Sequence, residues 1–226
     1  DTSNAKIPTW IGNVHFMTGR NDSALFWLRK AVAGNPVDYQ ARFFLSDAWR
    51  AAGDTARALD EFIEAFYLNP NGPNLRRFGE AMLERMGMRF DDDLYRFAFS
   101  ATGTPGKQAT ISLGDTKLLA AAATLAAWRF DDAFARARSE PGWESDMYLN
   151  VVANQAFLWS KDSATKAHPT SQQRKIMRLM DEQLMGSAVS WEYAASVSPA
   201  NIYVASPQAK ANILRYIRGY LIDTIR

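Results

Sequence analysis

The feature that most constrains the fold is a repeat: the sequence resembles itself when it is shifted by 34 residues. Residue types with distinct mechanical uses recur at this offset, and conservative pairs fill the gaps between them. The identical pairs are Gly19 with Gly53, Ala24 with Ala58, Leu25 with Leu59, Ala31 with Ala65, Asn35 with Asn69 and Pro36 with Pro70. Self-similarity at this period is typical of short structural units that stack against one another.

Each class of recurring residue has a place in a helical hairpin. A glycine follows each short apolar segment, and its tolerance of positive φ lets it end a helix. Alanines recur where a second helix must approach the first closely, and the bulky Leu28 and Phe62 lie between them at helical spacing. Pro36 and Pro70 close the units, because proline cannot continue a helix. The repeated unit is therefore predicted to be helix, tight turn, helix and proline-ended loop.

This pattern resembles the tetratricopeptide repeat. The resemblance rests on Gly-x4-Ala at 19–24 and 53–58, followed by Ala-x4-Pro at 31–36 and 65–70. It implies an all-α fold, namely a right-handed superhelical stack of helix-turn-helix repeats, or α-solenoid. The units that carry it clearly are 5–38 and 39–72.

Beyond residue 72 the register weakens, and we expect two degenerate units, 73–106 and 107–141. An apolar stripe predicts a first helix over 75–86, but small residues are missing from the second helix of this unit, which must pack differently. The last unit would have helices over 118–128 and 133–138. The repeat region is therefore expected to extend from residue 5 to residue 141.

The remaining residues, 142–226, are predicted to be helical without a recognisable repeat. Helices are expected over 147–160, from 170 towards 186, and from Pro207 onward, with an extended segment over 196–205. A stack of helix pairs leaves its last apolar face open, so we expect most of this region to cap the stack. The alternative is that the final helix docks on another domain or on a second copy of the chain, forming a homo-oligomer.

The charge balance disfavours a nucleic-acid partner. Lys and Arg number 26 against 24 Asp and Glu, a net charge of +2, whereas binding to phosphates requires a concentrated basic surface. The longest uncharged apolar stretch, 118–128, is shorter than the ~20 residues that span a bilayer, so we expect no membrane insertion by this chain. Cysteine is absent, and the chain begins at Asp1 rather than Met, which favours the periplasm or cell envelope over the cytoplasm.

No catalytic or metal site is expected. His15 occupies a position where the tetratricopeptide family places a packed tyrosine, and His168 lies in a loop that leads into a helix. Without cysteine or a second histidine nearby, neither can form a zinc site or a nucleophile–base pair. The acidic cluster at 91–93 lacks the spacing and the glycine of a calcium loop, and we interpret it as a helix start. We accordingly expect no cofactor.

The resemblance also implies a binding surface, because in this family the first helices of successive units line a concave groove. The exposed side of those helices is offset from the packing positions. The candidate partner-binding residues selected by this offset are Thr9, Asn13, Phe16, Phe43, Asp47, Arg50, Asn74 and Arg77. Aromatic and charged groups together suit an extended or helical peptide. The alternative is that these residues form ordinary solvated helix faces.

The leading hypothesis is a scaffold or adaptor that binds a protein or peptide partner, within a bacterial cell-envelope or polysaccharide-export assembly. A grip on chaperone tails is not expected, because only Asn13 matches the five positions of the family's carboxylate clamp. The alternative function is a recruitment or regulatory domain of a larger membrane-bound enzyme, such as a glycosyltransferase. In either case this chain itself is not expected to be an enzyme.

Overall fold

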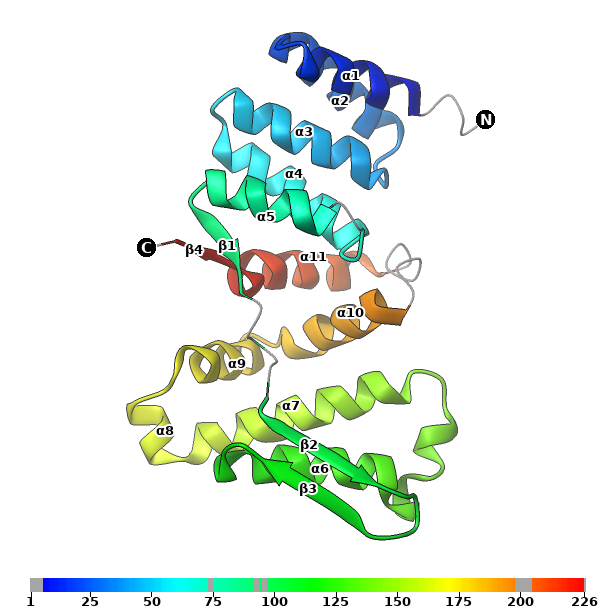
Figure 1. Ribbon diagram of the computed structural model, residues 1–226, viewed down its shortest axis with the longest axis vertical. Helices are drawn as coiled ribbons and strands as arrows, with labels where there is room; N and C mark the ends of the chain where they lie inside the picture. The colour runs from blue at the N-terminus through cyan, green and yellow to red at the C-terminus, as the bar shows by residue number, and fades with distance from the viewer. Residues whose placement is uncertain (1–5, 73–74, 92–93, 95–96, 198–204, 226) are drawn as a thin grey trace. The chain divides into compact units, whose positions relative to one another are not determined.

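The protein is mostly α-helical and divides into two compact units (Figure 1). The structure, a computed structural model, describes residues 6–72, 75–91, 94, 97–197 and 205–225. The first unit, here called the repeat unit, contains Asp1–Phe90 together with Ala195–Arg226. The second, here called the inserted unit, contains Asp91–Ala194. The chain therefore leaves the repeat unit, builds the inserted unit and returns.

The repeat unit begins with two helical hairpins whose bounds follow the 34-residue register. Their helices are α1 (Ile7–Met17), α2 (Asn21–Gly34), α3 (Tyr39–Ala51) and α4 (Thr55–Leu68). Gly19 and Gly53 have φ values of 73° and 85° and end α1 and α3, as expected. Each donates its N–H to the carbonyl three residues earlier, at 3.0 Å in both turns. The helical-repeat character predicted from the sequence is confirmed for this part of the chain.

The recurring small and bulky residues form the core between these helices. The alanines at 24, 31, 58 and 65 are buried, and so are Leu28 and Phe62. A Cβ placed on Gly12 would lie 2.5 Å from Leu28 Cγ, so glycine permits the close approach of α1 to α2. At the matching position of the next hairpin, the Ser46 hydroxyl donates to the Ala58 carbonyl at 2.5 Å. The two hairpins thus share one packing plan.

The third unit of the register has a first helix but no second one. Helix α5 (Leu75–Arg85) follows the register, and Gly87, with φ of 72°, ends it. The chain then forms the strand β1 (Met88–Phe90) where a second helix was expected. The Phe90 ring packs against the rings of Phe62 and Phe66, at centroid distances of 6.0 and 5.0 Å. An extended segment thus covers α4 in this unit.

The C-terminal segment returns to the same unit. Ser206 caps α11 (Pro207–Tyr216), and the chain continues through a π-helical turn, η6 (Ile217–Leu221), into β4 (Ile222–Thr224). Strand β4 pairs antiparallel with β1, and the two lie side by side in Figure 1. Helix α11 packs against α4, where Lys210 Nζ lies 2.9 Å from Glu64 Oε2. The helix predicted from Pro207 onward therefore ends at Tyr216 and is followed by η6 and a strand.

The inserted unit packs a β-hairpin and several helices around its own core. Its main elements are β2 (Phe99–Gly103), β3 (Ala109–Leu113), α6 (Leu119–Phe130), α7 (Trp143–Lys161), α8 (Ser163–Ala167), α9 (Ser171–Asp181) and most of α10 (Met185–Val197). Strands β2 and β3 pair antiparallel and pack against α6, which packs in turn against α7. Short 3-10 turns, η2 (Thr116–Leu118), η3 (Asp132–Phe134) and η4 (Ala137–Ser139), connect these elements.

Several sequence expectations differ from this arrangement. Helix α6 lies where expected, but η3 and η4 replace the helix predicted over 133–138, because each ends after one turn. By compactness, residues 142–194 belong to the inserted unit and 195–226 to the repeat unit. Most of the segment expected to be extended, at 196–205, lies outside the described residues.

Candidate interaction surface

The candidate residues lie on the first helices of the repeats, α1, α3 and α5, which follow one another in Figure 1. Because these helices share one register, equivalent residues form rows across them. The rows are Thr9, Phe43 and Arg77; Asn13 and Asp47; and Phe16 and Arg50. The remaining candidate, Asn74, lies outside the described residues. We call the surface formed by these rows the first-helix face.

Thr9 is buried, contrary to the expectation that it would be exposed on this face. Its exposed fraction is 2%, and its hydroxyl donates to Asp38 Oδ2 at 3.3 Å. Asp38 in turn caps α3, because its Oδ1 accepts the backbone N–H groups of Gln40 and Ala41. Thr9 therefore connects α1 to the start of α3 and has a structural role.

Asp47 and Arg50 form an ion pair in the middle of the face. The Arg50 Nε and Nη2 atoms lie 2.8 and 2.7 Å from Asp47 Oδ1, and both side chains are only partly exposed. Their spacing of three residues along α3 places both side chains on one side of the helix. The pair therefore presents an acid and a base together, at a fixed position.

The two aromatic candidates are shared between the face and the core. Phe43 is half-buried, and its ring lies 6.4 Å from the buried Phe62 ring, centroid to centroid. Phe16 is also half-buried and packs against the core cluster that contains Leu28 and Leu45. Replacement of either aromatic residue would therefore disturb packing as well as any partner contact.

Arg77 is the most accessible charged residue of the face. It is exposed, and its guanidinium carbon lies 5.8 Å from the ring centroid of Phe78, which is itself half exposed. Asn13, on α1, is partly buried. The described part of the face thus combines an exposed arginine, an ion pair, an amide and two partly buried aromatic rings.

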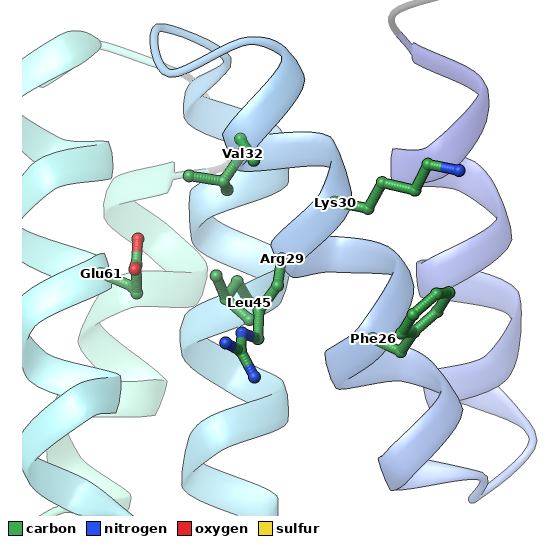
Figure 2. A pocket seen from close by; sticks show the side chains of 7 residues that line it. Phe26, Arg29, Lys30, Val32, Leu45 and Glu61 are labelled. Carbon is green, nitrogen blue, oxygen red and sulfur yellow. The ribbon is translucent and has the colours of Figure 1, made fainter.

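An open hollow of about 610 Å³ lies beside α2 on the second-helix side (Figure 2). Its lining comes mainly from α2, with one residue each from α3 and α4: Phe26, Arg29, Lys30, Val32, Ala33, Leu45 and Glu61. Burial raises the pKa of Glu61, while Arg42, 2.8 Å from its Oε2, acts in the opposite direction. The acidic group of this hollow is therefore already paired within the chain.

A third surface feature was not predicted from the sequence. Four large apolar side chains, here called the outer stripe, are exposed on α1: Ile7 (51%), Trp10 (52%), Val14 (61%) and Met17 (77%). Their spacing of three, four and three residues places them on one side of the helix. That spacing was present in the sequence, but of the apolar residues of this segment only Phe16 was selected as a candidate for a binding surface.

The residues considered for chemistry are divided between the two units. His15 is half-buried on α1, whereas His168 is exposed after α8. Asp91 lies outside any helix, contrary to the expected helix start, and residues 92 and 93 are not described. The Asp91 Oδ2 atom lies 2.6 Å from Lys175 Nζ, so the two side chains form an ion pair. Among the described residues, no three His, Asp or Glu side chains are grouped so that they could hold a metal ion.

In comparisons with known proteins, no family model, curated protein or solved structure matches the chain. Within the described residues, no helix combines the length and the apolar character needed to cross a membrane.

Proposed function

We propose that this protein is a tetratricopeptide-like scaffold that binds a protein or peptide on its first-helix face. The observation that carries the proposal is the shared geometry of α1, α3 and α5. Their closing glycines, Gly19, Gly53 and Gly87, all have positive φ and donate to the carbonyl three residues earlier, at 3.0, 3.0 and 2.9 Å. A common register and a common ending support a superhelical stack whose first helices display their side chains in rows.

The chemistry of the face suits an extended or helical peptide that carries both apolar and charged groups. The rings of Phe16 and Phe43 offer apolar contact area, and the Asp47–Arg50 pair and Arg77 offer charges of both signs. Arginine and aromatic residues are enriched among those that contribute most to interface energies. Charges fixed at the middle of the face would set the position of the peptide along it.

Charge reversal at Arg50 and Arg77 tests this proposal without removing a side chain from the hydrophobic core. Arg50→Glu with Arg77→Glu should reduce the capture of native partners from lysate at least tenfold. The reason is that truncating a dominant interface residue costs about 2 kcal/mol or more. Captured proteins are quantified by mass spectrometry on the immobilised native and variant chains, and circular dichroism verifies the fold.

Arg29→Glu is the matched control, because Arg29 is an exposed arginine of α2 on the second-helix side. Capture should be unchanged in this variant. If the double variant stays folded and captures the same proteins at full strength, the first-helix face is not the binding surface. Loss of capture in the control alone would indicate that partners bind at the hollow of Figure 2 instead.

A further inference from the structure

Helix α2 carries acidic, aromatic and basic side chains in order along one side. The exposed residues that share this side, here called the α2 strip, are Asp22, Phe26, Arg29, Lys30 and Ala33. Successive members spaced by three or four residues lie one above the other on a helix. The strip therefore runs from a carboxylate at its start, through an aromatic ring, to two cations in its second half.

The aromatic ring of the strip is held in place although it is exposed. Phe26 has an exposed fraction of 63%, and its ring meets the Trp27 ring edge to face at a centroid distance of 5.5 Å. The Lys30 Nζ atom lies 5.1 Å from the centroid of the same Trp27 ring. Edge-to-face contact is a favoured geometry of aromatic pairs. An exposed ring that is already ordered loses little conformational freedom when it binds.

The hollow of Figure 2 borders the α2 strip and offers space for such a ring. Its volume is about 610 Å³, and apolar side chains of Val32, Ala33 and Leu45 contribute to its lining. Phe26 and Arg29 belong both to this lining and to the strip. A molecule that fills the hollow therefore also meets the charges of the strip.

The order of charges makes the strip complementary to a second copy of itself. Antiparallel packing about a two-fold axis brings the start of one α2 beside the second half of the other. With the axis between residues 26 and 29, the Phe26 ring of one copy meets the Arg29 guanidinium of the other. Asp22 then comes opposite Ala33 of the second copy, one turn from the long side chain of Lys30. Within the described residues, neither Asp22 nor Arg29 has an ion-pair partner of its own.

We propose that two copies of the chain associate through α2 in this antiparallel arrangement. Phe26 of each copy enters the hollow of the other, so each hollow is completed by a residue of the second copy. The α2 strip uses no residue of the first-helix face, and this association does not depend on the function proposed for that face. Helix α2 has 14 residues and is about 21 Å long, so the contact is smaller than a standard interface and the dimer is weak.

Sedimentation velocity of the whole chain at low salt tests the proposal by charge exchange. The native chain should be partly dimeric at concentrations up to about 100 µM, the weak range that suits a small interface. Asp22→Lys and Lys30→Glu should each raise the Kd for dimerisation at least tenfold, because each substitution places like charges together twice across the two-fold axis. The chain that carries both substitutions should return to within about threefold of the native Kd, since opposite charges face each other again.

Phe26→Ser should also raise the Kd at least tenfold, because it removes the ring that enters the hollow. Phe157→Ser is the matched control, since Phe157 is 54% exposed but lies in the inserted unit, and it should leave the Kd unchanged. Circular dichroism verifies the fold of each variant. A native chain that stays monomeric over this range would overturn the proposal. A dimer that survives the single charge variants, or one that the exchanged pair fails to restore, would overturn it as well.

Discussion

At the scale of single residues, the repeat unit depends on positions where a side chain must be small or must find one particular partner. Gly12 marks the closest approach of α1 to α2, and Gly79 that of α5 to α4, where an added Cβ would lie 2.7 Å from the Phe62 ring. Thr9 and Asp38 connect the two hairpins through one hydrogen bond. These residues determine how closely the helices approach one another. Residues on the outer surfaces are not constrained in this way and can contribute to partner binding.

Gly12→Ala should destabilise the repeat unit, and Gly34→Ala should not. A methyl group at position 12 would meet the Leu28 side chain at 2.5 Å, and overpacking of this kind costs about 1–3 kcal/mol. No atom lies within 4 Å of a Cβ built at Gly34, which is the last residue of α2. There alanine should be neutral or stabilise the helix by up to about 1 kcal/mol. Chemical denaturation measures both variants, and equal losses would show that the α1–α2 contact is not tight.

At the scale of elements, the pairing of β1 with β4 holds the two parts of the repeat unit together. Met88, Arg89 and Phe90 face Thr224, Asp223 and Ile222 across this antiparallel pair. The Ile225 N–H donates to the Gly87 carbonyl at 2.8 Å, which extends the pairing to the glycine that ends α5. An ion pair between Arg218 and Asp60 adds a side-chain link to α4. The C-terminal segment is therefore held to the repeats by both backbone and side-chain contacts.

Ile222→Ala should loosen this connection much more than Ile225→Ala. Ile222 is 9% exposed and Ile225 is 47% exposed, although both belong to the same short segment. Truncation of a buried isoleucine costs about 2–5 kcal/mol, whereas changes at exposed sites stay within about 0.5 kcal/mol. Hydrogen exchange of α4 measures the effect locally, and it should accelerate only in the first variant. Similar exchange in both variants would mean that β4 does not stabilise the repeats.

At the scale of the whole molecule, one compact unit is built into the chain of another. The inserted unit has its own core, centred on Ala121, Leu125 and Met147, with β2 and β3 packed against it. The Gln155 amide donates to the Lys117 carbonyl at 3.0 Å, which joins α7 to η2, the turn that precedes α6. These contacts all lie within residues 91–194, so this unit does not require the repeats for its core.

Residues 91–194 expressed alone should therefore fold. A domain of this size with its own core is expected to unfold cooperatively, with a free energy of about 5 kcal/mol or more. Residues 1–90 alone should be less stable than in the full chain, because α4 loses its contacts with α11 and β1 loses β4. Urea denaturation of the two fragments and the full chain gives the comparison. A disordered 91–194 fragment beside a fully stable 1–90 fragment would contradict the division into units.

The parts of the fold that were predictable are those encoded by local chemistry. Glycine, alanine and proline at fixed offsets were enough to place α1 to α4, and an apolar stripe placed α5, because these signals act within a few residues of the chain. The pairing of Phe90 with Ile222 joins residues far apart in the chain, and no local sequence pattern predicts it. Strands β2 and β3 do contain β-branched and aromatic residues, such as Phe99, Thr110 and Ile111, but the helical register was extended over them.

The candidate surface was predictable to a similar extent. The register placed Asp47, Arg50 and Arg77 on first helices, where the structure has them. It could not show that Thr9 is buried, because that depends on the Asp38 carboxylate of the next hairpin. The outer stripe was missed because periodicity alone does not tell which apolar face of a terminal helix is covered.

The order of the two units along the chain has a consequence for biosynthesis. A ribosome that has completed β1 must synthesise the inserted unit, about 100 residues, before α11 and β4 emerge. At roughly 5–20 residues per second, this takes about 5–20 s. During that interval the surface of α4 later covered by α11 stays open to water and to chaperones, while the inserted unit has time to fold. Helix α4 and strand β1 are thus translated early but gain their last contacts late.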